Sequence, residues 1–278
     1  MSPITLSRTF TSSVLRAASV ALVISACHTT PDTALSYQGS STIGSSVLPE
    51  LISAFNKSTG IRFLQTNVDG SNRAFPAVMK GEAAIGGLSR PLAPAEMAKD
   101  AYTATIGYDA LSIFVNDANP VKSLTKKQLS DIFSGKVKRW SEVGGSDTPI
   151  ESLTETLDGH HGTVLFFQEA VMQGADLKPT KTFEMPSECV HEVSLNPGSV
   201  TTQAAFFAEP KTHAIAIDGL TPDPGTVRAG RYPLSRPLIL VAKNPPDDNA
   251  KRFIDWVQSP EGQAIVAKKF IPMAQPRS

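Results

Sequence analysis

Short apolar stretches of strand length alternate with helix-forming stretches along most of this chain. Residues 61–68 and 83–87 are typical of strands, and residues 72–80 between them are typical of a short helix. The alternation continues to the C-terminus, where a strand at residues 237–241 precedes one or two helices. Strands that alternate with helices predict an α/β fold with largely parallel sheets. A chain of 278 residues can bury one large hydrophobic core or two smaller ones.

Residues that cap helices indicate where two of these helices begin. Thr125 and Gln128 have the spacing of a capping box, in which each side chain bonds to the backbone of the other residue. Ser259 precedes Pro260, and proline is favoured at the first position of a helix. Apolar residues also recur on one helical face over residues 162–173. We therefore expect helices after Thr125 and Ser259 and across this range.

The charges of the chain balance. It has 26 basic and 26 acidic residues and a formal net charge of zero at pH 7. No long-range field therefore favours nucleic acid or an anionic membrane as a partner. If the chain binds an anion, it must do so with local dipoles and hydrogen-bond donors rather than with net charge.

The N-terminus has the features of an export signal. Arg8 and Arg16 precede an apolar stretch at residues 17–24, which is too short to span a bilayer comfortably. Two small residues and then Cys27 follow this stretch, a pattern that is similar to a bacterial lipobox. The alternative is an ordinary signal peptide with a cysteine near its cleavage site. We expect a lipoprotein signal peptide at residues 1–26.

In a lipoprotein, Cys27 receives a diacylglyceryl group and becomes the first residue of the mature chain. Two acyl chains suffice for stable anchoring, so we expect an exported, membrane-anchored protein of the cell envelope. Residues 27–36 are polar and are expected to form a tether. Cys189 is then the remaining cysteine and has no disulfide partner. A buried thiol is favoured there over a reactive one.

A series of motifs resembles one family along nearly the whole of residues 37–270. The series begins with Gly-Ser-Ser-Thr-Ile and includes Tyr-Pro-Leu-Ser-Arg-Pro-Leu near the end. In order, the matching stretches are residues 39–43, 70–72, 81–92, 107–111, 124–125, 132–135, 140–145, 232–238, 253–254 and 259–263. Together they are similar to the phosphate-binding proteins that supply bacterial ABC phosphate importers.

This resemblance implies a two-lobed type II periplasmic-binding-protein fold, each lobe a mainly parallel sheet flanked by helices. Residues 37–112 and 218–278 are expected to form the first lobe, and residues 113–217 the second. Chain crossings near Ile113 and Ile217 are expected to form a hinge that closes the lobes over a ligand. The family releases its ligand to an ABC permease in the inner membrane and catalyses no reaction, so we expect a monomer without cofactor, metal or catalytic residues.

Three segments lead from a small or hydroxyl-bearing loop into a helix: residues 41–43, 70–72 and 161–163. A helix N-terminus presents unsatisfied N–H groups and a partial positive charge, so several of them together can bind an anion. Thr42 and Thr163 are the hydroxyls most expected to contact it, followed by Ser71. The alternative for each is a simple helix cap. The candidate ligand-binding residues are Ser41, Thr42, Ile43, Ser71, Ser89, Arg90, His161, Gly162 and Thr163.

The sequence departs from the family pattern at two places in this candidate site. The family usually shows an arginine, three residues and then Ser-Gly-Thr, but here Leu157 holds the arginine position and His161 the serine position. Ser89 occupies the place of an aspartate that accepts the proton of a protonated phosphate, so strict selectivity for phosphate is not implied. Losing the arginine weakens binding by roughly 2–5 kcal/mol if nothing replaces it. Arg90 is either a second partner for an oxyanion or a structural ion pair.

His160 and His161 allow three interpretations. A protonated His161 could replace the missing charge, and binding would then strengthen as pH falls from about 8 to 6. A metal site with Glu155 and Asp158 is a second interpretation, which adjacent histidines disfavour because they point apart. A solvated loop is the third.

Three classes of function follow. The first is a receptor that delivers phosphate or a related oxyanion to an ABC permease. The second is a module that keeps the fold but senses a ligand or binds a partner protein without transport. The third is a hydrolase, which is disfavoured because Ser112 and Ser134 have no evident base partner and no Gly-x-Ser-x-Gly motif or P-loop is present.

Overall fold

The structure is a computed structural model that describes Met1 and residues 34–273. Residues 2–26 of the predicted signal peptide and Cys27 lie outside the described residues. The strands are β1 Leu35–Gly39, β2 Phe63–Asn67, β3 Ile85–Leu88, β4 Ala101–Asn116, β5 Ser123–Leu124, β6 Glu151–Glu155, β7 Lys181–Phe183, β8 Ser199–Ala204, β9 Thr212–Ile217, β10 Ser235–Lys243 and β11 Ile271–Pro272. The α-helices are α1 Ser41–Gly44, α2 Leu48–Thr59, α3 Ser71–Lys80, α4 Pro94–Met97, α5 Lys126–Phe133, α6 Gly162–Phe167, α7 Pro186–Leu195, α8 Pro224–Arg228, α9 Asp248–Gln258 and α10 Pro260–Val266. Short 3₁₀ helices η1 Trp140–Val143 and η3 Ala205–Phe207 and a π-helix η2 Gln168–Met172 complete the described elements.

One long strand, β4, is shared by the two lobes. Its first part, residues 101–110, pairs antiparallel with β10. Its second part pairs antiparallel with β8 and β9, starting from Leu111 opposite Ala204. The strand therefore passes from one sheet into the other.

In the first lobe the strand order is β2-β1-β3-β10-β4. β1 is parallel to both of its neighbours, whereas β10 is antiparallel to β3 and β4. Apolar side chains of α3, such as Phe75 and Val78, pack on one face against Leu88 and Val241. The helices α2, α9 and α10 cover the other face, so both faces of this sheet are buried.

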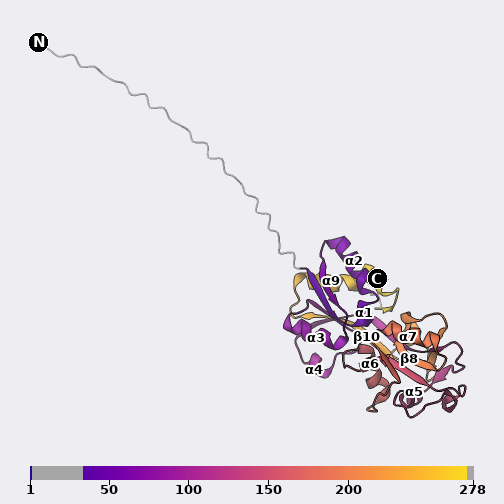
Figure 1. Cartoon of the computed structure of the whole chain (residues 1–278). Helices are drawn as coiled ribbons and strands as arrows, with labels where there is room; N and C mark the ends of the chain where they lie inside the picture. Colours follow the sequence, from indigo (N-terminus) through magenta and orange to yellow (C-terminus); the bar gives the residue numbers. More distant parts are fainter. Residues whose placement is uncertain (2–33, 274–278) are drawn as a thin grey trace. The chain divides into compact units, whose positions relative to one another are not determined.

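The second lobe repeats this layering around the strand order β4-β8-β6-β7. β6 is parallel to β7 and β8. Val190 and Val193 of α7 pack on Phe114 and Leu153, and α5 and α6 pack on the opposite face. Figure 1 shows α2, α3 and α9 in one lobe and α5, α6, α7 and β8 in the other. The α/β fold is confirmed, and both sheets are mixed because the chain reverses direction at β4 and β10.

The chain leaves the second lobe shortly before β10. Val227, Tyr232 and Leu234 pack in the same hydrophobic cluster as Ile113 and Ile217. The Tyr232 hydroxyl donates a hydrogen bond to the Leu111 carbonyl at 2.6 Å. The predicted lobe boundaries and the predicted end of the tether stay predictions; Leu35 and Ser36, at the end of that tether, lie in β1.

The helix starts expected from the sequence are confirmed. The N–H of Thr125 donates to Gln128 Oε1 at 2.8 Å, and the N–H of Gln128 donates to Thr125 Oγ1 at 3.1 Å. Ser259 Oγ accepts the N–H of Gly262 at the start of α10. Within the described residues, no helix is both long enough and apolar enough to cross a membrane.

Candidate functional site

Three helices begin close together where the two lobes face each other. α1 begins at Ser41 and α3 at Ser71 in the first lobe, and α6 begins at Gly162 in the second. The structure buries every residue predicted for the site. These residues are Ser41, Thr42, Ile43, Ser71, Ser89, Arg90, His161, Gly162 and Thr163.

Two serines of the first lobe, Ser71 and Ser89, face Gly162 of the second lobe. Ser71 Oγ accepts the N–H of Ser89 at 3.1 Å and lies 3.3 Å from Ser89 Oγ. A Cβ atom added to Gly162 would lie 2.3 Å from Ser71 Oγ and 2.8 Å from Ser89 Oγ. No larger residue fits between the lobes in this arrangement, so the family Gly-Thr motif has a steric reason here.

Arg236 joins the two threonines, and the sequence analysis did not identify it as a site residue. Its side chain is fully buried in β10, directly opposite Asp109 of β4. Nε and Nη2 donate to Asp109 Oδ2 at 3.0 and 2.8 Å. Nη2 also donates to Thr42 Oγ1 at 3.2 Å, and Nη1 donates to Thr163 Oγ1 at 3.1 Å. One guanidinium therefore holds a hydroxyl from each of two helix starts.

These contacts leave hydrogen-bond donors available at the site. Each threonine hydroxyl accepts an N–H from Arg236, so its own hydrogen is free to donate to another acceptor. A guanidinium has five N–H groups, and within the described part of the chain one N–H on Nη1 of Arg236 has no acceptor. The starts of α1, α3 and α6 add backbone N–H groups and positive dipole ends. The arrangement therefore suits a ligand that carries several acceptor oxygens.

The electrostatics are local, as the balanced composition requires. The charge of Arg236 is neutralised by Asp109, whose side chain is 3% exposed. Such a pair fixes the guanidinium in place without adding a net charge to the lobe. The attraction for an anion must then come from oriented donors, which act strongly where water is excluded.

His161 occupies the N-cap position of α6, and its ring contacts Glu155 and Thr156 of its own lobe. Nδ1 lies 3.0 Å from Glu155 Oε1, an ion-pair contact rather than an aligned hydrogen bond. Nε2 lies 3.0 Å from Thr156 Oγ1. The Glu155 carboxylate raises the pKa of His161 above its usual value and outweighs burial, which lowers it. A protonated His161 therefore pairs with Glu155 at the N-cap position of α6.

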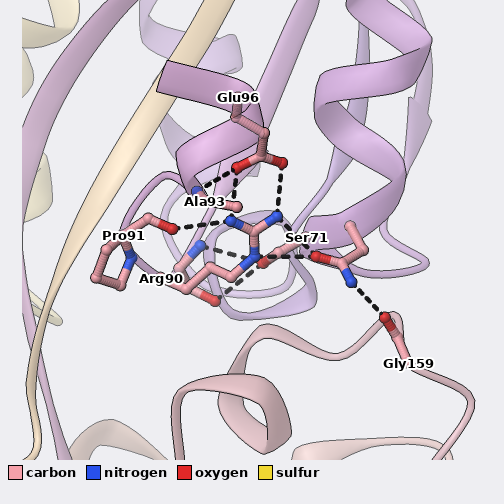
Figure 2. Close-up of polar contacts among 8 residues, drawn as sticks. Ser71, Arg90, Pro91, Ala93, Glu96 and Gly159 are labelled. Carbon is pink, nitrogen blue, oxygen red and sulfur yellow. Dashed lines mark hydrogen bonds and ion pairs between the residues drawn. The ribbon is translucent and has the colours of Figure 1, made fainter. Parts of the chain in front are cut away.

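Arg90 lies in the first lobe with all five of its N–H groups facing protein oxygens (Figure 2). Nη1 and Nη2 bind the two oxygens of Glu96, each at 2.8 Å. The remaining bonds go to Asn72 Oδ1 and to the Pro91 carbonyl. A structural ion pair was one of the two alternatives for Arg90 in the sequence, and this ion pair is present.

Three further observations concern possible metal ligands, the free thiol and a groove near His161. Among the described residues, no three His, Cys, Asp or Glu side chains come together as metal ligands. Cys189 is a buried free thiol in α7, and burial raises its pKa to about 12. A groove of about 520 Å³ beside His161 is lined by residues of both lobes, including Asp69, Arg73 and Glu184.

Comparisons with known proteins identify the family. A family model described as a PBP superfamily domain matches residues 25–261. The phosphate-binding protein PstS of Staphylococcus epidermidis strain RP62A is 30% identical over 247 residues, which are 82% of this chain and 75% of the relative. PstS of Bacillus subtilis is 28% identical over 248 residues, covering 84% of this chain and 81% of the relative.

Solved structures agree with this. An ABC-type phosphate transport receptor from Vibrio cholerae has a TM-score of 0.76 and 25% identity, and the match covers 86% of this chain and 100% of that one. A candidate phosphate ABC transporter substrate-binding protein from Clostridium perfringens, solved with bound phosphate, has a TM-score of 0.79 and 28% identity over 87% of this chain and 100% of that one. The two-lobed periplasmic-binding-protein architecture is therefore confirmed. The chain belongs to the PBP superfamily and, within it, to the family of the PstS phosphate-binding proteins.

Proposed function

We propose that this chain is the solute-binding component of a bacterial ABC importer and captures phosphate or a related oxyanion between its lobes. The observation that carries this proposal is the fully buried Arg236, which holds Thr42 Oγ1 and Thr163 Oγ1 at 3.2 and 3.1 Å. The names of the relatives and the bound phosphate in the Clostridium perfringens protein support the same ligand class.

A tetrahedral oxyanion fits the donors that converge here. Its oxygens can accept the hydroxyl hydrogens of Thr42 and Thr163 and the remaining N–H of Arg236. Backbone N–H groups at the starts of α3 and α6 supply further donors. Arg236 then provides from β10 the guanidinium that Leu157, which is 48% exposed, does not provide from the second lobe.

Binding without turnover agrees with the side chains around Arg236. Asp109 is engaged by Arg236 and cannot act as a free general base. Ser112 Oγ is buried and has no hydrogen-bond partner among the described residues, so no base activates it as a nucleophile. Among the described residues around Arg236, donors are present without a nucleophile paired to a base, which supports the receptor over the hydrolase.

The finer features of the proposal concern delivery and location. Two segments connect the lobes, β4 and the segment that enters β10, and bending at both would open the cleft. We propose that the first lobe, which the chain re-enters at β10, moves against the second lobe, and that the closed form presents the ligand to an inner-membrane permease. A lipid on Cys27 would keep this monomeric receptor at the membrane.

Replacing Thr163 with valine tests the proposal, because valine keeps the shape and removes the hydroxyl. A hydrogen bond to a charged group contributes about 1.5–3 kcal/mol, so we expect roughly 10- to 150-fold weaker phosphate binding. Calorimetric titration with phosphate and then with sulfate at pH 6 and pH 8 measures this.

Thr202→Val is the matched control. Thr202 is a buried threonine of the same lobe whose hydroxyl has no hydrogen-bond partner among the described residues. We expect this variant to bind phosphate like the unmodified protein. If Thr163→Val also binds normally, or if the unmodified protein binds neither anion, the proposed site is wrong.

A further inference from the structure

We propose that Asn72, positioned by Arg90 and Glu96, is a latch that holds the two lobes closed without contacting the ligand. The inference rests on the proposed function, because a closed cleft matters only if the cleft takes a ligand. The latch comprises Asn72, Arg90 and Glu96 of the first lobe, and it acts on the loop between β6 and α6 of the second.

Asn72 bonds to the second lobe through both its side chain and its backbone. Nδ2 donates to the Gly159 carbonyl at 2.6 Å, and the backbone N–H donates to the His160 carbonyl at 3.3 Å. The neighbouring Gly70 has φ +117°, and an added Cβ would lie 2.4 Å from the His160 oxygen. The two lobes are therefore in backbone contact at the start of α3, and Asn72 supplies the hydrogen bonds across this contact.

Arg90 determines which way the Asn72 amide points. Its Nε and Nη2 donate to Asn72 Oδ1 at 3.0 and 2.7 Å. Reversing the amide would place its NH₂ group against the guanidinium, where donors would face donors. The amide oxygen must therefore face Arg90, and Nδ2 is left to donate to the carbonyl of Gly159.

Glu96 in turn fixes Arg90. The two side chains form a fork-to-fork pair with both N–O distances at 2.8 Å, and they are only 9% and 14% exposed. Glu96 Oε2 also accepts the N–H of Ala93 at 2.8 Å. Bidentate pairs of this kind add geometric precision as well as energy. Every contact of the guanidinium stays within the first lobe, so Arg90 is a positioning residue and does not touch the anion.

Asn72→Asp removes the side-chain hydrogen bond to the second lobe and keeps the contacts with Arg90. Aspartate keeps the shape and still accepts the two bonds from Arg90, but it replaces the donor to Gly159 with an oxygen that repels the carbonyl. The loss of this hydrogen bond and the repulsive contact that replaces it correspond to roughly 10-fold weaker phosphate binding. We expect most of the loss to lie in a faster release rate, because the latch forms only after the lobes close.

The test measures the full chain and the variant in three ways. Calorimetry with inorganic phosphate gives affinity, and stopped-flow gives release. Hydrogen exchange of the ligand-free protein reports closure at the N–H of Asn72, which donates to His160 across the lobes, and at residues 159–162, which pack against the start of α3. The matched control is Lys80→Ala, an exposed residue at the other end of α3. It should leave all three measurements unchanged.

A second variant distinguishes the latch from a general loss of stability. Arg90→Lys keeps a positive charge near Glu96 but cannot bind Asn72 Oδ1 twice at the same time. We expect it to increase exchange at residues 159–162 in the other lobe while the unfolding midpoint stays close to that of the unmodified protein. Release and exchange that are unchanged in both variants overturn the latch.

The latch and the proposed function fail in different ways. If the unmodified protein binds no phosphate, the proposed function fails, but increased exchange of the ligand-free Asn72→Asp variant still supports the latch. If phosphate binds normally and Asn72→Asp leaves affinity, release and exchange unchanged, the latch is wrong and the proposed function stands.

Discussion

Replacing Arg236 with lysine probes the centre of the proposed site. Arg236 makes four hydrogen bonds, two to Asp109 Oδ2 and one each to Thr42 and Thr163. Lysine carries the same charge but offers its three N–H groups from a single nitrogen, which cannot reach all three residues. We expect lysine to keep the pair with Asp109 and to lose both threonines and the N–H that faces the ligand.

The expected loss follows from these contacts. The N–H to the ligand alone contributes about 1.5–3 kcal/mol, so phosphate affinity should fall at least roughly 10- to 150-fold. Removing the charge altogether would leave Asp109 buried and unpaired at a cost of about 3–5 kcal/mol in stability. Lysine avoids most of this cost, and the thermal unfolding midpoint should therefore change little compared with the affinity.

Calorimetric titration with phosphate, together with thermal unfolding, is the assay. The matched control is Arg139→Lys, which changes an exposed arginine paired with Asp147 on the surface of the second lobe. The reasoning is refuted if folded Arg236→Lys protein binds phosphate with an affinity within about threefold of that of the unmodified protein. The N–H of Arg236 would then not contribute the free energy of a hydrogen bond to a charged ligand.

Two further outcomes are expected. Because Glu155 raises the pKa of His161 in the folded protein, the stabilisation by protonated His161 is complete below about pH 6.5 and is lost as pH rises through the raised pKa. Phosphate affinity should fall over the same pH range. The affinity is compared with that of the His161→Gln variant at each pH, so that the ionisation of phosphate cancels. A ratio of the two affinities that stays constant from about pH 6 to pH 9 contradicts this. Cys27→Ser should move the protein from the membrane fraction of the cell envelope to the soluble fraction, and a variant that stays with the membranes contradicts the lipid anchor.

The features that the sequence could predict are local ones. The alternation of strands and helices, the capping box at Thr125 and the cap at Ser259 each depend on residues a few positions apart, and the structure confirms them. The small and hydroxyl-bearing helix starts at Thr42 and Thr163 are local signals too, and the structure brings both to one guanidinium.

The ion pair of Arg236 with Asp109 could not be predicted in the same way. The two residues are 127 positions apart and meet because β10 and β4 pair antiparallel in a specific register. Asp109 lies within β4, and Arg236 directly precedes the apolar residues of β10. Two opposite charges in strands of one sheet were the available signal. Local pattern does not specify which strands are neighbours.

Local sequence pattern also did not predict the carboxylate partners of His161 and Arg90. Glu155 ends β6, a strand of mostly polar residues that the alternation did not reveal. Its carboxylate lies 3.0 Å from Nδ1 of His161. Arg90 is held by Glu96, six residues later in a short helix. In both cases a nearby carboxylate competes with the ligand for the cationic side chain.

Locating the anion in crystals grown with phosphate tests the central proposal most directly. We expect phosphate density between the lobes, with its oxygens roughly 2.5–3.2 Å from the hydroxyls of Thr42 and Thr163 and from Nη1 of Arg236. Phosphate bound elsewhere, or a closed cleft that holds only water under these conditions, would contradict it.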